Sequence, residues 1–226
     1  MLQRLFSYVF PNRCIFCGEK IPFDRYFCEN CFIPEKPCVR MFNLKPGRKG
    51  LKSHILKVNS PAIYEGYYRK SLHLFKFRKK TSFAESYAKL ITDMGIYDKD
   101  ADFITYVPLT KKKQRDRGYN QSELIAEKLS LYTNIPVKEA LIKNKDNDLQ
   151  HTLKKEERSN NIKGVYEVNS EVKGKNIILV DDIVTTGATL VECASILYKA
   201  GALAVSGICA ADAQTRNYSE NKSHKT

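Results

Sequence analysis

The 226-residue sequence has no apolar run approaching the roughly 18 residues that a membrane-spanning helix requires. Its first ten residues are too short and too aromatic for a secretion signal, and no small-residue cleavage site follows them. None of the four histidines stands in the spacing typical of metal-binding or catalytic-triad histidines. With 42% hydrophobic and 11% aromatic residues, the composition is that of a globular protein. We therefore expect a cytoplasmic protein with one α/β core and a small accessory module.

Acidic residues are scarce in two segments, which concentrates the net charge of +13. Residues 40–80 contain twelve Lys/Arg and one acid, and residues 111–117 contain five Lys/Arg and one acid. Clustered positive charge attracts polyanions such as phosphates and nucleic acids. A solvated lysine-rich surface is the alternative.

Aromatic residues interrupt the cations of the first segment: Phe42, Tyr64, Tyr67, Tyr68, Phe75 and Phe77. Such a mixture suits attraction of the phosphate backbone and stacking of bases, as in proteins that bind single-stranded DNA. Alternatively, these aromatics form the core of a hood over the sheet.

Strand and helix patterns alternate in the second half of the chain. Strands are predicted at 103–107, 176–180 and 204–210, and helices at 121–131 and 190–199. The consecutive apolar residues of 176–180 indicate a strand that is covered on both faces. This order predicts an α/β fold with a mostly parallel twisted sheet and helices on both faces.

Four regions are expected along the chain. They are a cysteine module at 1–38, basic aromatic-rich hood or linker helices at 39–100, the α/β domain at 101–213 and a disordered tail at 214–226. Helices are predicted at 67–78 and 81–94 within the second region. The long polar segment 143–158 is predicted to be a mobile lid. Its His151 is either close to a ligand or a solvated loop residue.

Two acids, Asp181 and Asp182, follow the predicted strand 176–180. Ligands of open parallel sheets bind at the edge where the strands end. The next residues form a short glycine-containing turn that runs into a helix: Thr185, Thr186, Gly187, Ala188 and Thr189. Backbone N–H groups, the helix dipole and threonine hydroxyls suit a phosphate, and the adjacent acids suit sugar hydroxyls, directly or through Mg²⁺. The pattern therefore predicts a sugar-phosphate site, whereas an acidic strand end with an ordinary helix cap is the alternative.

A second basic turn follows the first strand of the α/β region and carries Arg115, Arg117 and Gly118. If it lies at the same sheet edge as Asp181, its cations and N–H groups suit a second anionic group of the ligand. A basic loop followed by a helix start at Asn120 is the alternative interpretation.

Four of the seven cysteines form two Cys-x2-Cys pairs that are separated by ten residues: Cys14, Cys17, Cys28 and Cys31. Each pair places two thiolates on one tight turn, and two turns complete a tetrahedron around Zn²⁺. Four protein ligands leave no open position, so a structural zinc is expected, with unliganded thiols as the alternative. Cys193 and Cys209 are expected to pack as small apolar residues.

The loop from Val180 to Thr189 resembles the phosphoribosyl pyrophosphate motif of type I phosphoribosyltransferases. Within that superfamily, residues 12–211 resemble the ComF family of competence proteins. Three further features carry this resemblance: the Val107–Ser122 stretch, the spaced residues between Gln150 and Gly164, and the cysteine-rich N-terminus. Many relatives have another cysteine pair near Cys38, which this chain lacks, so a second metal site is not expected.

The resemblance implies a ligand, phosphoribosyl pyrophosphate with Mg²⁺, whose pyrophosphate meets the Arg115–Gly118 turn. It also implies a role in natural transformation, on imported single-stranded DNA, alongside a helicase and other competence proteins. The pocket would then bind its ligand or a DNA 5′-phosphate. The alternative is an Mg²⁺-dependent phosphoribosyltransferase with an unidentified acceptor, and a housekeeping salvage enzyme is a less favoured form of it.

Overall fold

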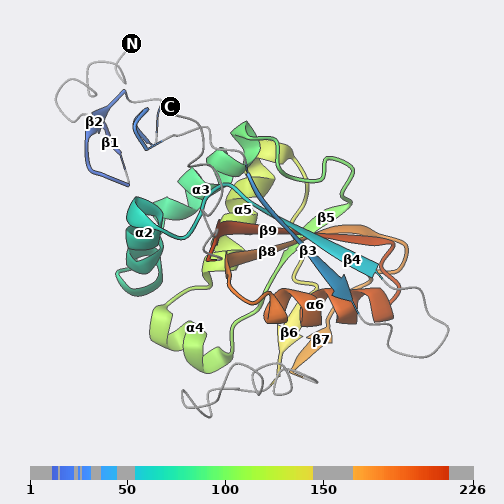
Figure 1. Cartoon of the computed structure of the whole chain (residues 1–226). Helices are drawn as coiled ribbons and strands as arrows, with labels where there is room; N and C mark the ends of the chain where they lie inside the picture. The colour runs from blue at the N-terminus through green and yellow to red at the C-terminus, as the bar shows by residue number, and fades with distance from the viewer. Residues whose placement is uncertain are drawn as a thin grey trace, which may run out of the picture.

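The computed structural model describes residues 12–14, 16–22, 25, 27–31, 37–44, 54–144 and 165–213. Its centre is a five-stranded sheet in the order β3-β4-β9-β8-β5 (Figure 1). The strands are β3 (Cys38–Leu44), β4 (His54–Ser60), β9 (Ala204–Asp212), β8 (Asn176–Val184) and β5 (Phe103–Tyr106). Only the β3–β4 pair of this sheet is antiparallel. The predicted mostly parallel α/β sheet is confirmed.

The sheet has a hydrophobic core on each face, which explains the consecutive apolar residues of β8. Ile178 and Val180 face a cluster with α2 (Gly66–Phe77), α3 (Ser82–Asp93) and α5 (Gln121–Thr133). The alternate β8 residues Ile177 and Leu179 face a second cluster, which contains Leu190, Cys193 and Leu197 of α6 (Ala188–Lys199). Alternation along the strand sends neighbouring side chains to opposite faces, so both must be apolar.

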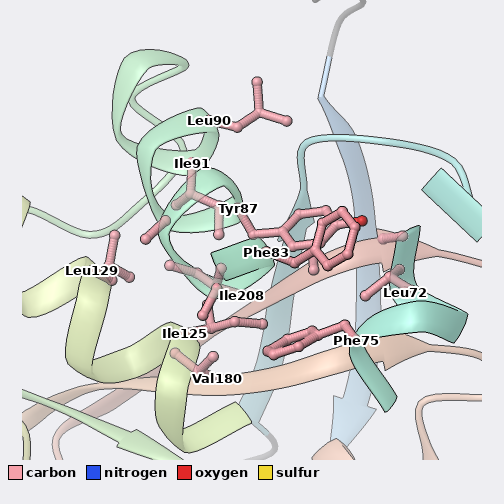
Figure 2. Packing of buried hydrophobic residues seen from close by; sticks show 14 of the residues in the cluster. Leu72, Phe75, Phe83, Tyr87, Leu90, Ile91, Ile125, Leu129, Val180 and Ile208 are labelled. Carbon is pink, nitrogen blue, oxygen red and sulfur yellow. The ribbon is translucent and has the colours of Figure 1, made fainter. Parts of the chain in front are cut away.

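The first core is formed where three helices meet the sheet. Figure 2 shows Phe75 and Leu72 of α2 packed with Tyr87 and Phe83 of α3. The Tyr87 ring is fully buried, and its hydroxyl lies 2.5 Å from that of Ser71 on α2. The helices predicted at 67–78 and 81–94 correspond to α2 and α3.

Two strands, β3 and β4, occupy a part of the chain for which the sequence predicted only helices. Their alternation is hard to recognise because apolar residues lie on both faces. Val39 and Met41 are exposed, whereas Phe42 and Leu44 pack with the second core. Arg40, between the two exposed residues, contacts the loop before α6. The antiparallel hairpin therefore extends the sheet at its β9 edge.

Small elements complete the described chain. β1 (Asn12–Arg13) pairs with β2 (Lys20–Ile21) in the cysteine module, and β6 (Leu141–Lys143) pairs with β7 (Tyr166–Val168). Most of the predicted lid, including His151, lies outside the described residues, as do the tail and the stretch from Gln150 to Gly164. Within the described ranges, no helix has the length and hydrophobicity needed to span a bilayer.

Candidate ligand site and candidate metal centre

The acid pair lies inside β8, close to its C-terminal end. The sequence predicted that the strand stops at Val180, but pairing with β9 continues through Val184. The prediction was too short because β9 also extends further, to Asp212, and supplies hydrogen-bond partners. On the other side of β8, the Val107 N–H donates to the Val180 carbonyl at 2.9 Å. The chain leaving β5 therefore passes beside Asp181, at the predicted sheet edge.

Asp181 accepts two hydrogen bonds through the same carboxylate oxygen. Ser122 Oγ donates to Oδ1 at 3.0 Å, and the backbone N–H of Asp182 donates to it at 2.8 Å. Burial, reinforced by the negative charge of Asp182, raises the pKa of Asp181 to about 7. The carboxyl group therefore changes charge near neutral pH.

Asp182 forms an ion pair with a lysine from another part of the chain. Lys76 Nζ on α2 lies 2.8 Å from Asp182 Oδ2. The two side chains are only 20% and 13% exposed. In this partly buried setting the pair is screened less than a surface ion pair. The structure thus places one cation against Asp182, the second of the two adjacent acids.

The turn after β8 leads into α6 through Gly187, which has a φ of 78° and is the N-cap residue of that helix. Glycine suits this left-handed conformation and has no side chain with which to cap the helix, whereas Thr186 Oγ1 accepts from the Ala188 N–H at 3.4 Å. Thr185 and Thr186 are exposed beside it. The sequence predicted the helix start at Leu190, but α6 begins at Ala188. Ala188 and Thr189 therefore belong to its first turn.

Two side chains of strand β3 contact this turn. Arg40 Nη1 donates to the Thr185 carbonyl and lies 3.4 Å from Asp212 Oδ1. The Arg40 guanidinium also lies 4.8 Å from the centre of the Phe42 ring. A Cβ atom added to Gly187 would overlap that ring. The glycine is therefore required both by its backbone conformation and by the close approach of Phe42.

The second predicted turn is largely helical. Lys111–Arg117 form α4, which Thr110 caps by accepting from the Lys113 N–H at 3.3 Å. Gly118, with a φ of 84°, ends this helix. The expectation of a loop failed because lysine and arginine are good helix formers between a capping threonine and a terminal glycine.

The two arginines of this segment differ in their contacts. Arg117 Nη1 donates to Gln121 Oε1 at 3.1 Å, and its guanidinium lies 5.7 Å from the Phe77 ring centre. Gln121 is the residue before Ser122, and Ser122 donates to Asp181. Arg117 therefore binds the sequence neighbour of a residue that contacts Asp181. Arg115 is exposed, and no contact described for the folded part of the chain ties it to the acid pair.

Several residues of the site escaped prediction from the sequence: Arg40, Phe42, Lys76 and Ser122. Ser122 was detectable, since it ends the basic stretch and starts a helix at a strand end. Its neighbour Asn120 fixes that start by accepting from the Ser122 N–H and donating to the Val107 carbonyl, both at 3.0 Å. Lys76 gave no separate signal among the twelve cations of residues 40–80.

The four cysteines of the predicted metal site converge. All four Sγ atoms lie within 4.8 Å of one another, and those of Cys17 and Cys28 are 3.6 Å apart. Tetrahedral zinc with bonds of about 2.3 Å needs sulfur atoms about 3.8 Å apart, so the arrangement fits this ion. Three of the four thiols are buried, and burial raises the pKa of Cys28 to about 11. A bound cation would offset this cost by replacing the proton.

Local turns bring each cysteine pair together. The Gly18 N–H donates to the Cys14 carbonyl at 2.7 Å, and the Cys31 N–H donates to the Cys28 carbonyl at 3.1 Å. Gly18 has a φ of 81°, which favours glycine. The described residues therefore contain a four-cysteine cluster that can hold a metal ion such as zinc.

The other cysteines lie elsewhere and are also free thiols. Cys193 in α6 and Cys209 in β9 are fully buried among apolar residues, as expected. Cys38 is buried at the start of β3.

Comparison with known proteins shows a domain and a set of relatives. Residues 117–226 match the phosphoribosyl transferase domain. Over most of its length the chain is similar to proteins that include competence proteins of the ComF type. The DNA utilization protein YhgH of Escherichia coli (strain K12) is 28% identical over 207 residues, covering 87% of this chain and 88% of that protein.

Two competence proteins are similar to this chain to the same degree. Competence protein F of Haemophilus influenzae is 27% identical over 199 residues, covering 83% of this chain and 79% of that protein. Competence protein ComFC of Bacillus subtilis is 27% identical over 199 residues, covering 83% of this chain and 78% of that protein. Because these alignments extend beyond residues 117–226, the similarity also includes part of the N-terminal half.

Proposed function

We propose that this ComF-type chain binds phosphoribosyl pyrophosphate with Mg²⁺ at the sheet edge where β5 and β8 end. Asp181 and Asp182 receive the ribose hydroxyls, directly or through the ion. The 5′-phosphate is assigned to the turn and first helical residues that follow: Thr185, Thr186, Gly187, Ala188 and Thr189. The pyrophosphate is assigned to the end of α4: Arg115, Arg117 and Gly118.

The observation that carries the proposal is the sequence of features along one strand. Two carboxylates of β8 are followed within five residues by a helix whose N-cap is Gly187. The N-terminus of a helix carries about half a positive charge and offers N–H donors, which suits a phosphate dianion. When bound, Mg²⁺ would supply charge that reduces repulsion between the pyrophosphate and the acid pair.

Calorimetric titration with phosphoribosyl pyrophosphate and Mg²⁺ tests this proposal. The wild-type chain should bind, and Asp181→Asn/Asp182→Asn should weaken binding by about 100-fold or more, because charge-assisted hydrogen bonds are lost. The control is Asp98→Asn/Asp100→Asn, a pair near Asn176 at the opposite end of β8. Equal affinity of both double variants would contradict the proposed site.

We also propose that the chain handles single-stranded DNA in transformation. The names of the relatives, together with one surface of the molecule, support this role. Tyr67 and Phe77 of α2 are 55% and 59% exposed. The surface around them includes exposed cations on α2 and after it: Arg69, Lys70, Arg78, Lys79 and Lys80. Phe75, in contrast, is fully buried, so the core interpretation holds for this aromatic residue.

Binding of a fluorescein-labelled oligothymidine tests the DNA role. Replacing Phe77 with alanine should weaken binding about tenfold if a base stacks on its ring. Arg78→Gln/Lys80→Gln should reduce the slope of affinity against salt, because fewer phosphate contacts release fewer counterions. Leu131→Ala is the matched control, since Leu131 is 70% exposed on α5. Unchanged affinity and salt slope in the α2 variants would contradict this role.

Catalysis is the second candidate function, favoured by the match to a phosphoribosyl transferase domain. In that case an acceptor attacks the ribosyl carbon, and pyrophosphate departs toward α4. Pyrophosphate release measured across purine, pyrimidine and amine acceptors distinguishes transfer from binding alone. Release that depends on both an acceptor and the acid pair would establish turnover.

A further inference from the structure

We propose that α2 is a positioning arm that connects the cysteine cluster to the acid pair. One end of the arm is held by the cluster through Tyr68, and the other end places the Lys76 ammonium on Asp182. The arm thus lets metal binding at the cluster adjust ligand affinity at the sheet edge, which rests on the proposed ligand function.

The N-terminal end of α2 contacts the cysteine module directly. Tyr68 Oη donates to the carbonyl oxygen of Cys31 at 3.0 Å. The Phe16 ring, between two of the metal-ligand candidates in sequence, lies 4.9 Å from the Tyr68 ring. Phe16 itself is buried and belongs to the same core as α2 and α3. Ordering of the module by a metal therefore fixes two groups that touch Tyr68.

Packing between the module and α2 is incomplete next to this contact. A cavity of about 300 Å³ is lined by Asn30 and Cys31 on the module side and by Gly66 and Tyr67 at the helix start. Direct packing is therefore interrupted there, which leaves the Tyr68 hydrogen bond and the Phe16 ring as important connections. These are specific contacts that single substitutions can remove.

The helix between its two ends is a rigid connector. Lys76 lies eight residues after Tyr68, which corresponds to about 12 Å along a helix axis. Leu72 and Phe75 are fully buried between them, and Figure 2 shows both side chains within the core. Ser71 is held by the Tyr87 hydroxyl and by the Tyr68 carbonyl. A shift at Tyr68 is therefore transmitted along the helix.

The Lys76–Asp182 contact at the far end affects the proposed ligand in two ways. The Lys76 ammonium fixes the position of the Asp182 carboxylate beside Asp181, and it adds a cation to a site for a polyanion. Lys76 acts through Asp182 and is therefore a positioning residue. Because Lys76 lies outside residues 117–226, this contribution comes from a part of the chain outside the matched domain.

A double-mutant cycle measures the connection. Tyr68→Phe removes one hydroxyl and keeps the ring, and it should weaken phosphoribosyl pyrophosphate binding about threefold. Lys76→Met should weaken it about tenfold, and Lys76→Arg should restore part of the affinity because it retains the charge. The double variant Tyr68→Phe/Lys76→Met should bind no more weakly than Lys76→Met alone.

Two control variants, Tyr132→Phe and Lys89→Met, should leave affinity unchanged, since Tyr132 donates to Glu85 and Lys89 pairs with Asp93, away from the acid pair. Calorimetry is carried out on the zinc-loaded full chain with Mg²⁺ present. Multiplicative effects of the two α2 substitutions, or equal effects of Tyr68→Phe and Tyr132→Phe on ligand affinity, would overturn the proposed connection through α2.

A ligand-free measurement separates failure of the arm from failure of the proposed function. Hydrogen exchange of the backbone amides of residues 181–189 should become faster in both Tyr68→Phe and Lys76→Met. If wild-type protein does not bind phosphoribosyl pyrophosphate, the ligand proposal fails while the exchange result still decides on the arm. Faster exchange in Lys76→Met but not in Tyr68→Phe would refute the connection.

Discussion

The cysteine cluster and the sheet-edge site are built in opposite ways. The cluster takes all four ligands from residues 14–31, and two local turns aim them at one point. The sheet-edge site combines residues from β3, α2, α5 and β8, which lie far apart in the chain. We therefore expect the order of the cluster to depend on a bound metal ion, whereas the edge site depends on the folded sheet. This difference predicts which perturbation damages which site.

The largest expected effect is loss of the metal on replacing Cys28 with serine. Serine is a poor zinc ligand, so the metal content should fall from about one ion per chain to near zero. The module should then become sensitive to protease, because a bound metal would supply most of the folding free energy of so small a segment. Limited proteolysis and metal analysis measure both. Cys38→Ser is the control and should retain the metal, since Cys38 lies outside the cluster. If the Cys28→Ser protein kept its full metal content, the proposed difference between the two sites would be wrong.

The next largest effect concerns the edge site alone and comes from Gly187→Ala. The new methyl group would overlap Phe42, and the residue has a φ of 78°. We expect ligand affinity to fall by about 100-fold and stability by about 2 kcal/mol, while metal content stays unchanged.

Two companion variants separate clash from backbone strain. Gly174→Ala tests strain alone, because Gly174 has a φ of 71° and open space around it. Phe42→Ala combined with Gly187→Ala should recover part of the affinity by removing the clash. Equal ligand affinity in Gly187→Ala and wild-type protein would show that Phe42 and Gly187 do not constrain the site.

A pH effect should distinguish Asp181 from exposed acids. Its pKa in the folded protein is raised to about 7, above the ordinary value of about 3.9 in an unfolded chain. The folded state therefore binds the proton more tightly, so this contribution to stability is present below about pH 4 and is lost as the pH rises through about 7. Relative to wild type, Asp181→Asn should be more stable by about 2 kcal/mol at pH 8 than at pH 5. Urea denaturation at the two pH values measures this difference, and a pH-independent difference would argue against the raised pKa.

The smallest effect is expected for Ser122→Ala, which removes one donor to Asp181. Ligand affinity should fall about fivefold, in line with the loss of a single hydrogen bond. The pKa of Asp181 should rise further, because its ionised form loses a stabilising contact. Ser130→Ala, on the same helix, is the control. An effect no larger than that of Ser130→Ala would remove Ser122 from the site.

The two regions also differ in how far the sequence predicts them. All four cluster cysteines follow from spacing, because the geometry is local. The strand before Asp181 and the glycine turn also follow, since a buried parallel strand has a recognisable apolar run. Arg40 and Phe42 could not be predicted, because β3 was not recognised as a strand of the sheet. Lys76 depends on how α2 packs, and this packing is set by long-range contacts rather than by local pattern.

The helix at Lys111–Arg117 shows the same limit on a smaller scale. A basic, polar segment suggested a loop, although its capping threonine and terminal glycine fit a short helix. The division of the chain into a hood at 39–100 and a domain at 101–213 remains a prediction. Strands β3 and β4 share one sheet with the later strands. A boundary between these two regions would therefore separate functions and not separately folded units.

A crystal structure of the full chain with phosphoribosyl pyrophosphate and Mg²⁺ tests the central claim most directly. The account predicts that the ribose hydroxyls meet Asp181 and Asp182 and that the 5′-phosphate lies on the backbone amides at the start of α6. Density for the ligand at another surface, with Asp181 still bonded to Ser122 and Asp182 still paired with Lys76, would contradict it.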